Sequence, residues 1–319
     1  MKALRFDGKT LKIEERQTPN VPDECLVRVV RSGICNTDIE IVSGYAGFTG
    51  TIGHEFAGVV EASTERPDLV GRRVVGEINA GCGACSVCRT GDERHCPQRT
   101  VLGIKGRDGA HAEFLTLPAR NLFEIPANVT DDEAVFVEPL AAAFGISEQV
   151  NIDAESKVAV IGDGKLGLLC IRSLASLSNN LFLIGKHPEK LKLGKSSGAE
   201  TILSADAEKL ARYFDIVVEA SGSESGFASA VDLVRPRGKI VLKSTFHGRP
   251  SWEAWRVVVD EITIVGSRCG RFAPALELLS KRNVDVSDLI TERFGLSDGV
   301  AAVAAAGRSG VMKVILNMN

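Results

Sequence analysis

The sequence of 319 residues predicts an α/β protein with a β-rich part and a doubly wound parallel sheet. Short, partly alternating apolar runs separated by Gly, Pro or Asp fill residues 1–130, and no long amphipathic helix interrupts them. From about residue 150, continuous apolar runs alternate with helical segments, which is the pattern of parallel strands buried on both faces. The length is more than twice that of a typical domain, so we expect two domains.

Composition and charge exclude several classes of protein. The net charge of −3 gives no electrostatic reason to expect nucleic acid or an acidic membrane surface as a partner. No apolar run reaches the length of a transmembrane helix, and no apolar signal segment follows Met1. We therefore expect a soluble cytoplasmic protein. In a reducing compartment, clustered cysteines are better explained as metal ligands or catalysts than as disulfides.

The β-rich part contains six predicted strands, at 2–7, 12–16, 25–34, 56–63, 72–78 and 112–118. Thr130 and Glu133 fit a capping box that opens a helix, and Pro139 is expected to break or bend this helix near Glu138. The parallel sheet is predicted from runs at 158–162, 181–185, 200–203, 215–220, 239–244 and 262–267. After about residue 283, the tail predicts one more helix and a strongly apolar last strand.

A glycine-rich turn follows the first parallel strand. Residues 162–167 read G-x-G-x-x-G and comprise Gly162, Asp163, Gly164, Lys165, Leu166 and Gly167. The motif has meaning because it joins a strand to a helix, where its glycines let the backbone approach a pyrophosphate and the helix N-terminus attracts negative charge. The alternative is a glycine turn that only connects two elements. The context favours a dinucleotide-binding Rossmann domain.

The second parallel strand lacks the acidic residue that normally binds the adenosine ribose of NAD. It ends in Gly185, Lys186 and His187, with no carboxylate between 182 and 188. A small residue followed by cations suits the 2′-phosphate of NADP. Lys186 and His187 could also be solvated residues before a helix that starts at Pro188. We favour NADP(H) over NAD(H).

Four cysteines lie within fifteen residues in the segment 81–97, at the spacing C-x2-C-x2-C-x7-C. An iron–sulfur cluster of the bacterial ferredoxin type has three residues, not seven, before its last cysteine. A zinc site of four thiolates needs no open coordination position and suits the polar loop between the third and fourth cysteines. We therefore predict structural zinc, bound by Cys82, Cys85, Cys88 and Cys96.

Cys35 stands apart from this cluster, and His54 and Glu138 follow it at long intervals. A thiolate, an imidazole and a carboxylate could form the three-ligand set of a catalytic zinc ion with an open fourth position. By themselves these residues are a weak signal, because a lone cysteine is often a small buried hydrophobe. A lone histidine in a strand is also more often a core residue than a ligand.

The order of the motifs is more specific. C-x-T-D at 35–38, G-H-E-F-A-G-V-V at 53–60, the four-cysteine loop, E-P-L at 138–140 and G-x-G-x-x-G follow one another along the chain. Together they resemble the zinc-containing medium-chain alcohol dehydrogenase family over nearly the whole chain. The polyol, threonine and glucose dehydrogenase branches are the most similar. The resemblance implies a GroES-like catalytic domain of residues 1–147 and 283–319, with a Rossmann domain of residues 148–282 inserted between its two segments.

The resemblance also implies roles for individual residues. Cys35 and His54 would bind a catalytic zinc, and Glu55 and Glu138 would bind it directly, through water or in alternation. Thr37 would receive the substrate proton, and Asp38 would orient the histidine. Many relatives have a proton-relaying histidine where this chain has Glu40, so Glu40 either relays the proton or is a surface residue.

The implied activity is hydride transfer between a polar secondary alcohol, such as a polyol or sugar, and NAD(P), with two zinc ions per chain and a homodimer or homotetramer. The edge strand at 262–267 is the expected site of assembly. Predicted pocket residues are Ser43, Tyr45, Phe48, Arg268 and Arg271, of which Arg268 also lies toward the cofactor. Two other functions stay open: an iron–sulfur electron carrier and a catalytically silent nucleotide-binding zinc protein.

Overall fold

The computed structural model describes residues 1–245 and 254–318, and it divides into two compact units. The β-rich unit comprises Met1–Glu138, Ala275–Lys281 and Val286–Asn319, and the parallel-sheet unit comprises Pro139–Pro274 and Arg282–Asp285. The predicted domain limits at 147/148 and 282/283 stay a prediction. Helix α4 (Val137–Gln149) runs across the first of them.

The β-rich unit is built from three sheets. Its strands are β1 (Lys2–Phe6), β2 (Leu11–Glu15), β3 (Glu24–Ile34), β4 (Gly50–Thr51), β5 (Glu55–Ala62), β6 (Arg73–Gly76), β7 (Asn79–Ala80), β8 (Thr100–Leu102), β9 (Gly106–Arg107), β10 (Phe114–Pro118), β11 (Leu122–Glu124), β18 (Ile290–Gly295) and β19 (Lys313–Asn317). The largest sheet has the order β11-β6-β5-β3-β19-β18, and β10 also pairs with β3. The two smaller sheets have the orders β2-β1-β4 and β7-β8-β9.

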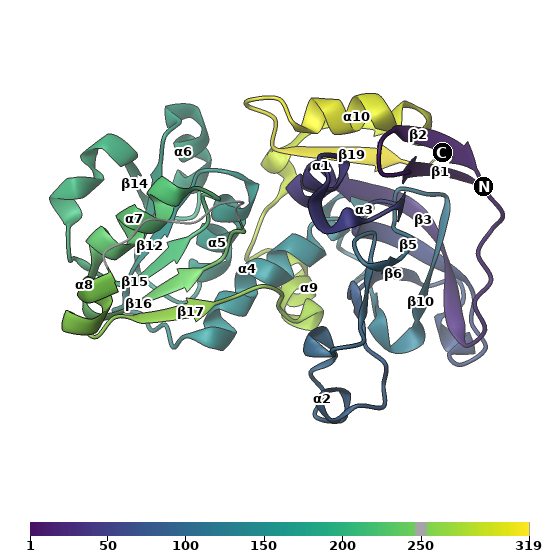
Figure 1. Cartoon of the computed structure of the whole chain (residues 1–319), viewed down its shortest axis with the longest axis horizontal. Helices are drawn as coiled ribbons and strands as arrows, with labels where there is room; N and C mark the ends of the chain where they lie inside the picture. The colour runs from purple at the N-terminus through teal and green to yellow at the C-terminus, as the bar shows by residue number, and fades with distance from the viewer. Residues whose placement is uncertain (246–253, 319) are drawn as a thin grey trace. The chain divides into compact units, whose positions relative to one another are not determined.

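Strand β3 lies at the centre of the largest sheet (Figure 1). On one edge, its first residues pair with β10 and its last residues, 31–34, pair with the C-terminal strand β19. On the other edge it pairs with β5. Its alternate residues Cys25, Val27 and Val29 are fully buried in the core, which is why this strand alternates in the sequence.

The helices of the β-rich unit are short: α1 (Asn36–Val42), α2 (Ser86–Arg89), α3 (Asp131–Ala134), α9 (Phe272–Ser280) and α10 (Gly299–Ala306). The predicted capping box is present, since Thr130 caps α3 and its side chain bonds to Glu133. The predicted break near Glu138 is wrong in position. The helix is interrupted earlier, between α3 and α4, and Pro139 lies in the first turn of α4, where a missing N–H costs no hydrogen bond.

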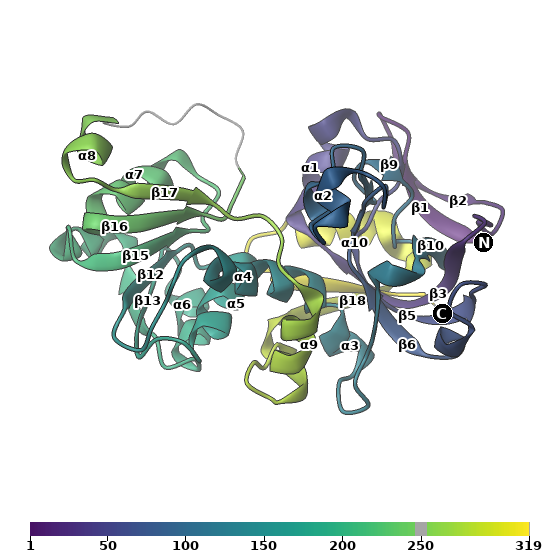
Figure 2. The ribbon, with the colours of Figure 1, turned by 90° about the horizontal axis from the view of Figure 1, so that it is seen from below.

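The parallel-sheet unit has six parallel strands in the order β14-β13-β12-β15-β16-β17. This is the doubly wound order of dinucleotide-binding folds. The strands are β12 (Lys157–Ile161), β13 (Asn180–Gly185), β14 (Glu200–Leu203), β15 (Phe214–Glu219), β16 (Val234–Leu242) and β17 (Thr263–Gly266), and the helices are α5 (Lys165–Leu174), α6 (Pro188–Lys195), α7 (Glu224–Leu233) and α8 (Ala254–Val259). Helices α5 and α6 cover one face of the sheet and α7 covers the other (Figure 2).

The strand predictions are confirmed in both units, and β17 is an edge strand as expected. The small strands β4, β7, β8, β9 and β11 were not predicted, and neither was β18 in the tail. These strands have two to six residues and carry little periodicity. Among the described residues, no helix is both long and apolar enough to cross a membrane.

Candidate functional site

Three strands of the β-rich unit converge on one site because of their register. Strand β3 ends at Ile34, so Cys35 is the next residue along the chain. Gly33 is paired with Glu55 at the start of β5, and Ile34 is paired with Val314 near the start of β19. The register therefore places Cys35, the His54–Glu55 pair and Lys313 together.

Cys35, His54 and Glu55 form a set of candidate metal ligands. One ligand atom from each lies within 4.8 Å of the others. Glu55 Oε1 is buried and has no hydrogen-bond partner among the described residues, so it is free to bind a metal. Thiolate, imidazole and carboxylate are all zinc ligands, so the donor set fits zinc with an open position.

Asp38 connects the start of α1 to His54. It accepts a hydrogen bond from the amide of Cys35 at 2.8 Å and another from the amide of Gly53 at 3.0 Å. Its Oδ1 lies 3.5 Å from Nδ1 of His54, and its Oδ2 lies 3.5 Å from Nε2 of His111. Burial alone would raise the pKa of Asp38, but the two imidazoles hold it well below its usual range. The carboxylate of Asp38 thus faces Nδ1 of His54, which leaves Nε2 of the ring for a metal.

A buried ion pair holds Glu55 in place. Lys313 and Glu55 are 2 % and 1 % exposed, and Nζ of Lys313 bonds to Oε2 of Glu55. Burial would lower the pKa of Lys313, but Glu55 raises it above its ordinary value. A Cβ atom at Gly33 would lie 2.4 Å from the same Oε2, so glycine is needed there to admit the carboxylate.

The other residues predicted for this site lie outside the set of three candidate ligands. Glu138 is half-buried and is not among the three clustered ligands. Burial, together with the charge of Glu55, raises its pKa to about 7. Thr37 lies beside the site, with Oγ1 3.7 Å from Sγ of Cys35. Glu40 accepts a hydrogen bond from the side chain of Asn36 at 3.0 Å.

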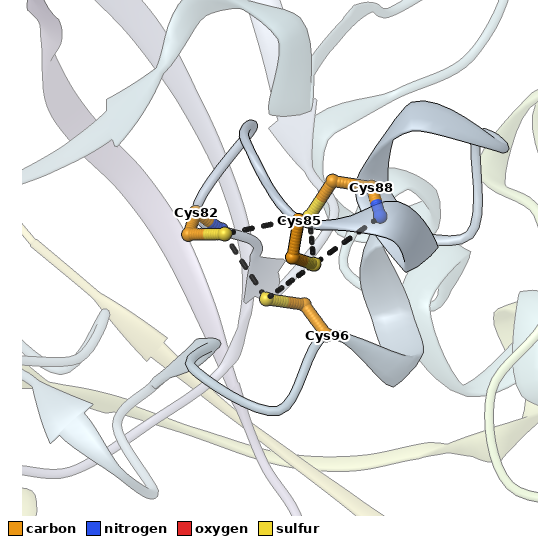
Figure 3. A group of neighbouring side chains, drawn as sticks. All are labelled: Cys82, Cys85, Cys88 and Cys96. Atoms are coloured by element: carbon orange, nitrogen blue, oxygen red, sulfur yellow. Dashed lines mark hydrogen bonds between the residues drawn. The ribbon is translucent and has the colours of Figure 1, made fainter.

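The four-cysteine loop forms a second candidate metal centre. Its side chains converge on a common centre (Figure 3), with Sγ–Sγ distances of 3.5 Å for Cys85–Cys88, 3.7 Å for Cys85–Cys96 and 4.0 Å for Cys82–Cys88. Four sulfurs at the usual zinc–sulfur bond length on a tetrahedron lie about 3.8 Å apart. The backbone amides of Ala84 and Cys85 lower the pKa of Cys82 to about 6, whereas burial raises the pKa of Cys88 to about 12. The arrangement fits a single zinc ion.

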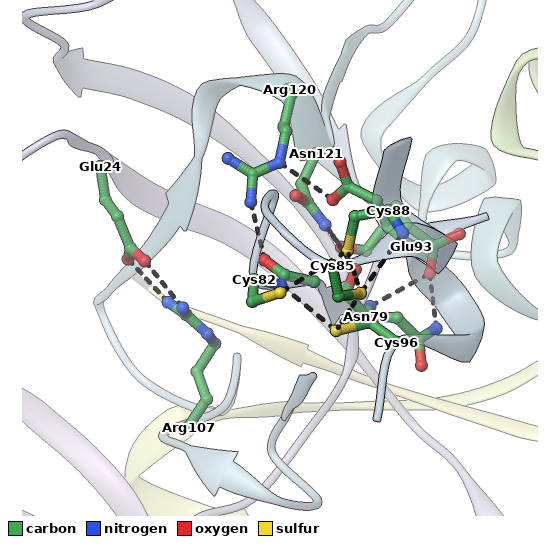
Figure 4. Close-up of polar contacts among 12 residues, drawn as sticks. Glu24, Asn79, Cys82, Cys85, Cys88, Glu93, Cys96, Arg107, Arg120 and Asn121 are labelled. Carbon is green, nitrogen blue, oxygen red and sulfur yellow. Dashed lines mark hydrogen bonds and ion pairs between the residues drawn. The ribbon is translucent and has the colours of Figure 1, made fainter. Parts of the chain in front are cut away.

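Polar contacts fasten this loop to the β-rich unit (Figure 4). Arg120 bonds to the carbonyl of Gly81 at 2.8 Å and to Glu93 at 2.9 Å. The side chain of Asn121 donates to the carbonyls of Glu77 and Asn79. Nearby, Arg107 and Glu24 form a two-pronged ion pair. The loop is thus held by ordinary hydrogen bonds at its base, while the cysteines organise its tip.

The glycine-rich turn of the parallel-sheet unit has the geometry of a phosphate cradle. Gly162 has φ +120°, and a Cβ there would lie 2.7 Å from the carbonyl oxygen of Ala220. A Cβ at Gly167 would lie 1.8 Å from the carbonyl oxygen of Gly162, so the helix packs directly on the turn. Gly164 caps α5 and has open space around it, and α5 begins with Lys165 and Leu166. The residues fit a dinucleotide at the N-terminus of α5.

The remaining cofactor and pocket residues lie as follows. Gly185 ends β13, and the side chains of Lys186 and His187 after it are exposed. The carbonyl of Arg268 accepts a hydrogen bond from Lys243 at 2.7 Å. Arg271 is exposed and forms an ion pair with Glu148.

Of the predicted pocket residues after Glu40, the hydroxyl of Ser43 bonds to the carbonyl of Ile39. Phe48 is buried in the core of the β-rich unit, and Tyr45 packs against that core. Two surface hollows of the β-rich unit, of about 830 and 530 Å³, are lined by none of the predicted metal ligands.

Comparison with known families and proteins agrees with this geometry. Residues 21–127 match the alcohol dehydrogenase GroES-like domain, and residues 166–281 match the zinc-binding dehydrogenase domain. The chain is 31% identical to L-threonine 3-dehydrogenase of Deinococcus deserti over 93% of this chain and 92% of the relative. The chain belongs to the zinc-containing medium-chain alcohol dehydrogenase family.

Solved structures of other dehydrogenases have the same fold. The rspB dehydrogenase of Escherichia coli CFT073, in complex with NADH, is 28% identical with a TM-score of 0.92, over 100% of this chain and 99% of that one. A zinc-binding dehydrogenase of Sinorhizobium meliloti 1021, bound to NADP, is 26% identical with a TM-score of 0.90, over 99% and 98%. The fold thus occurs with both nicotinamide cofactors.

Two residues of this dehydrogenase's site were missed from the sequence. Lys313 is a single charge in a strongly apolar strand, and that exception could have signalled a buried partner. His111 is completely buried, 2.7 Å from the hydroxyl of Ser32 and beside Asp38. A histidine near the start of a short strand gives no such signal.

We expect the substitution Lys313→Met to destabilise this dehydrogenase by about 3–5 kcal/mol, because it leaves the buried Glu55 carboxylate without its counter-ion. The double variant Lys313→Met/Glu55→Gln should recover much of this loss, since no uncompensated charge remains. Chemical denaturation followed by circular dichroism on both single variants and the double variant measures the coupling. Additive effects would show that the ion pair is not coupled.

Proposed function

We propose that the protein is a zinc-dependent, NAD(P)-linked dehydrogenase that interconverts a polar secondary alcohol and the corresponding carbonyl compound. The observation that carries the proposal is the clustering of Cys35, His54 and Glu55, with Thr37 beside the cysteine. A metal site with an open position and a neighbouring hydroxyl is what proton removal from an alcohol requires. The parallel-sheet unit supplies the dinucleotide turn.

The residues of the β-rich unit have different roles at this site. Cys35 and His54 would hold the metal, with Glu55 as the third ligand or, while paired with Lys313, as a nearby carboxylate. Bound zinc acts as a Lewis acid that lowers the pKa of an alcohol, and the nicotinamide accepts hydride. Asp38 keeps the imidazole of His54 in one orientation, a supporting role that commonly tunes metal affinity.

The hydroxyl of Thr37 would receive the substrate proton at Oγ1. Glu40 lies one helical turn further along α1, where its carboxylate is bonded to Asn36. The Glu40 carboxylate could therefore relay a proton from Thr37 to solvent only if its hydrogen bond with Asn36 breaks. Glu138, with its pKa near 7, would carry a proton or a charge depending on whether a metal is present.

The four cysteines of the loop would hold a second, structural zinc. A metal with four thiolate ligands has no open position for substrate, so its contribution is to the stability of the loop. The Sγ–Sγ distances of 3.5–4.0 Å suit one ion, whereas a cluster of several iron atoms would hold the sulfurs farther apart. Two zinc ions per chain are the expected content.

The substrate class follows from the segment between Cys35 and Gly47, which is similar to the glucose and polyol branches of the family. We propose a hydroxyl-rich or otherwise polar secondary alcohol. The preference for NADP(H) predicted from Lys186 and His187 depends on how much of their positive charge is available to a 2′-phosphate. A homodimer or homotetramer formed through edge strand β17 is proposed on the same resemblance.

Metal analysis tests the two zinc sites. The purified protein should contain about two zinc ions per chain, and both Cys35→Ser and Cys88→Ser should reduce this to about one. The two variants differ in what they lose. Cys35→Ser should abolish turnover with little change in melting temperature, whereas Cys88→Ser should lower the melting temperature. One zinc in the wild type, unchanged by Cys35→Ser, would indicate a silent protein.

A substrate panel tests the activity itself. Sugars, polyols and secondary alcohols are assayed with NAD and NADP in parallel, and reduced nicotinamide is measured by its absorbance. We expect turnover with at least one polar secondary alcohol. No reduced nicotinamide with any member of the panel, from protein that holds two zinc ions, would contradict the proposal.

With a substrate in hand, Thr37→Val should lower kcat by about 10²–10⁴, the usual contribution of a positioned proton-transfer group. Thr37→Ser is the matched control, since it keeps the hydroxyl and should retain most of the activity. The zinc content of both variants should equal that of the wild type. Equal kcat values for Thr37→Val and Thr37→Ser would remove Thr37 from the proton path.

A further inference from the structure

A carboxylate lies at the C-terminal end of β13, although β13 itself contains no acidic residue. Asp163, the second residue of the glycine-rich turn, reaches across to this end of the strand. Its Oδ2 accepts a hydrogen bond from the backbone amide of His187 at 2.7 Å, and its Oδ1 lies 3.0 Å from Nδ1 of the His187 ring. The side chain is largely buried, with 6 % exposed.

Two glycines make this position possible. Gly162 adopts φ +120° and its amide donates to the carbonyl of Ile184 at 2.8 Å, which ties the turn to the end of β13. At Gly185, a Cβ atom would lie 2.5 Å from Oδ2 of Asp163 and 2.6 Å from its Cβ. The carboxylate of Asp163 therefore fills the space that a side chain at residue 185 would occupy.

The end of the second strand is where dinucleotide-binding folds place the acid that binds the adenosine ribose. In this chain that acid comes from the turn after the first strand instead. Burial would raise the pKa of Asp163, but the hydrogen bonds of His187 lower it, so the group is ionised at neutral pH. The amides of Lys186 and His187 and the His187 ring donate to it, which leaves about one of its roughly four acceptor positions for a ribose hydroxyl.

We propose that Asp163 selects NAD(H) over NADP(H). Its carboxylate accepts a hydrogen bond from a hydroxyl of the adenosine ribose and repels a 2′-phosphate. The inference rests on the proposed dehydrogenase function and names the residue that sets its cofactor specificity. It reverses the preference predicted from Lys186 and His187, because the strand end that lacks an acid in its own sequence has the Asp163 carboxylate against the ring and amide of His187.

The same geometry has a purely structural explanation. His187 is the N-cap residue of α6, so Asp163 could serve only to fix the entry into that helix. The substitution Asp163→Asn separates the two roles. Asparagine has the same shape and can still accept the His187 amide, but it carries no charge.

Binding of reduced cofactor, measured without substrate, provides the test. NADH and NADPH are titrated into the purified full-length chain, and the two dissociation constants are obtained from nicotinamide fluorescence. We expect the wild type to bind NADH at least about tenfold more tightly than NADPH, and Asp163→Asn to reduce this ratio by about tenfold or more, chiefly through tighter NADPH binding.

The matched control is Asp232→Asn. Asp232 is also an ion-paired aspartate of the parallel-sheet unit, but it lies in the last turn of α7, just before β16 begins, and so at the end of the parallel strands opposite the turn. Its substitution should leave the ratio of the two dissociation constants unchanged. A change of similar size in both variants would mean that net charge, not the position of Asp163, determines the ratio.

Three results would overturn the inference. A wild type that binds NADPH more tightly than NADH would overturn the inference, whether or not Asp163→Asn folds. An unchanged ratio in folded Asp163→Asn would leave Asp163 with the structural role only. Failure to bind either cofactor would overturn the dehydrogenase proposal as well, whereas turnover with a preference for NADPH would leave that proposal intact.

Discussion

The pairing of β3 along both of its edges is the constraint on which the β-rich unit and its site depend. Strand β5 occupies one edge, while β10 and β19 share the other. With both edges paired, the strand cannot slip without turning its buried side chains outward. Cys35 follows its last residue, so the thiol is fixed relative to residues more than 250 positions away in the sequence.

The features that could be predicted from the sequence are those whose residues are close together in the chain. The four cysteines lie within fifteen residues, and their spacing alone indicates that they can surround one ion. The dinucleotide turn is likewise complete within six residues, between a strand and a helix that each have a clear apolar pattern. The strands of the parallel sheet were recognisable because burial on both faces makes them continuously apolar.

The features that could not be predicted depend on register between distant segments. Nothing near Lys313 indicates that its ammonium group meets Glu55, because that contact follows from which residues of β3, β5 and β19 are opposite one another. At the end of β13, the sequence showed two cations and no acid. The carboxylate beside them belongs to a different strand–helix turn, so a reading of one strand end at a time overlooks it.

The last strand also affects how the protein is made. Strand β19 leaves the ribosome after the other strands of its sheet, so the largest sheet of the β-rich unit cannot be completed until Lys313–Asn317 has been synthesised. The parallel-sheet unit, formed mainly by residues 139–274, has all six strands available earlier and is free to fold first. During that interval, the end of β3 has an unpaired edge, which is the kind of surface that promotes association between nascent chains.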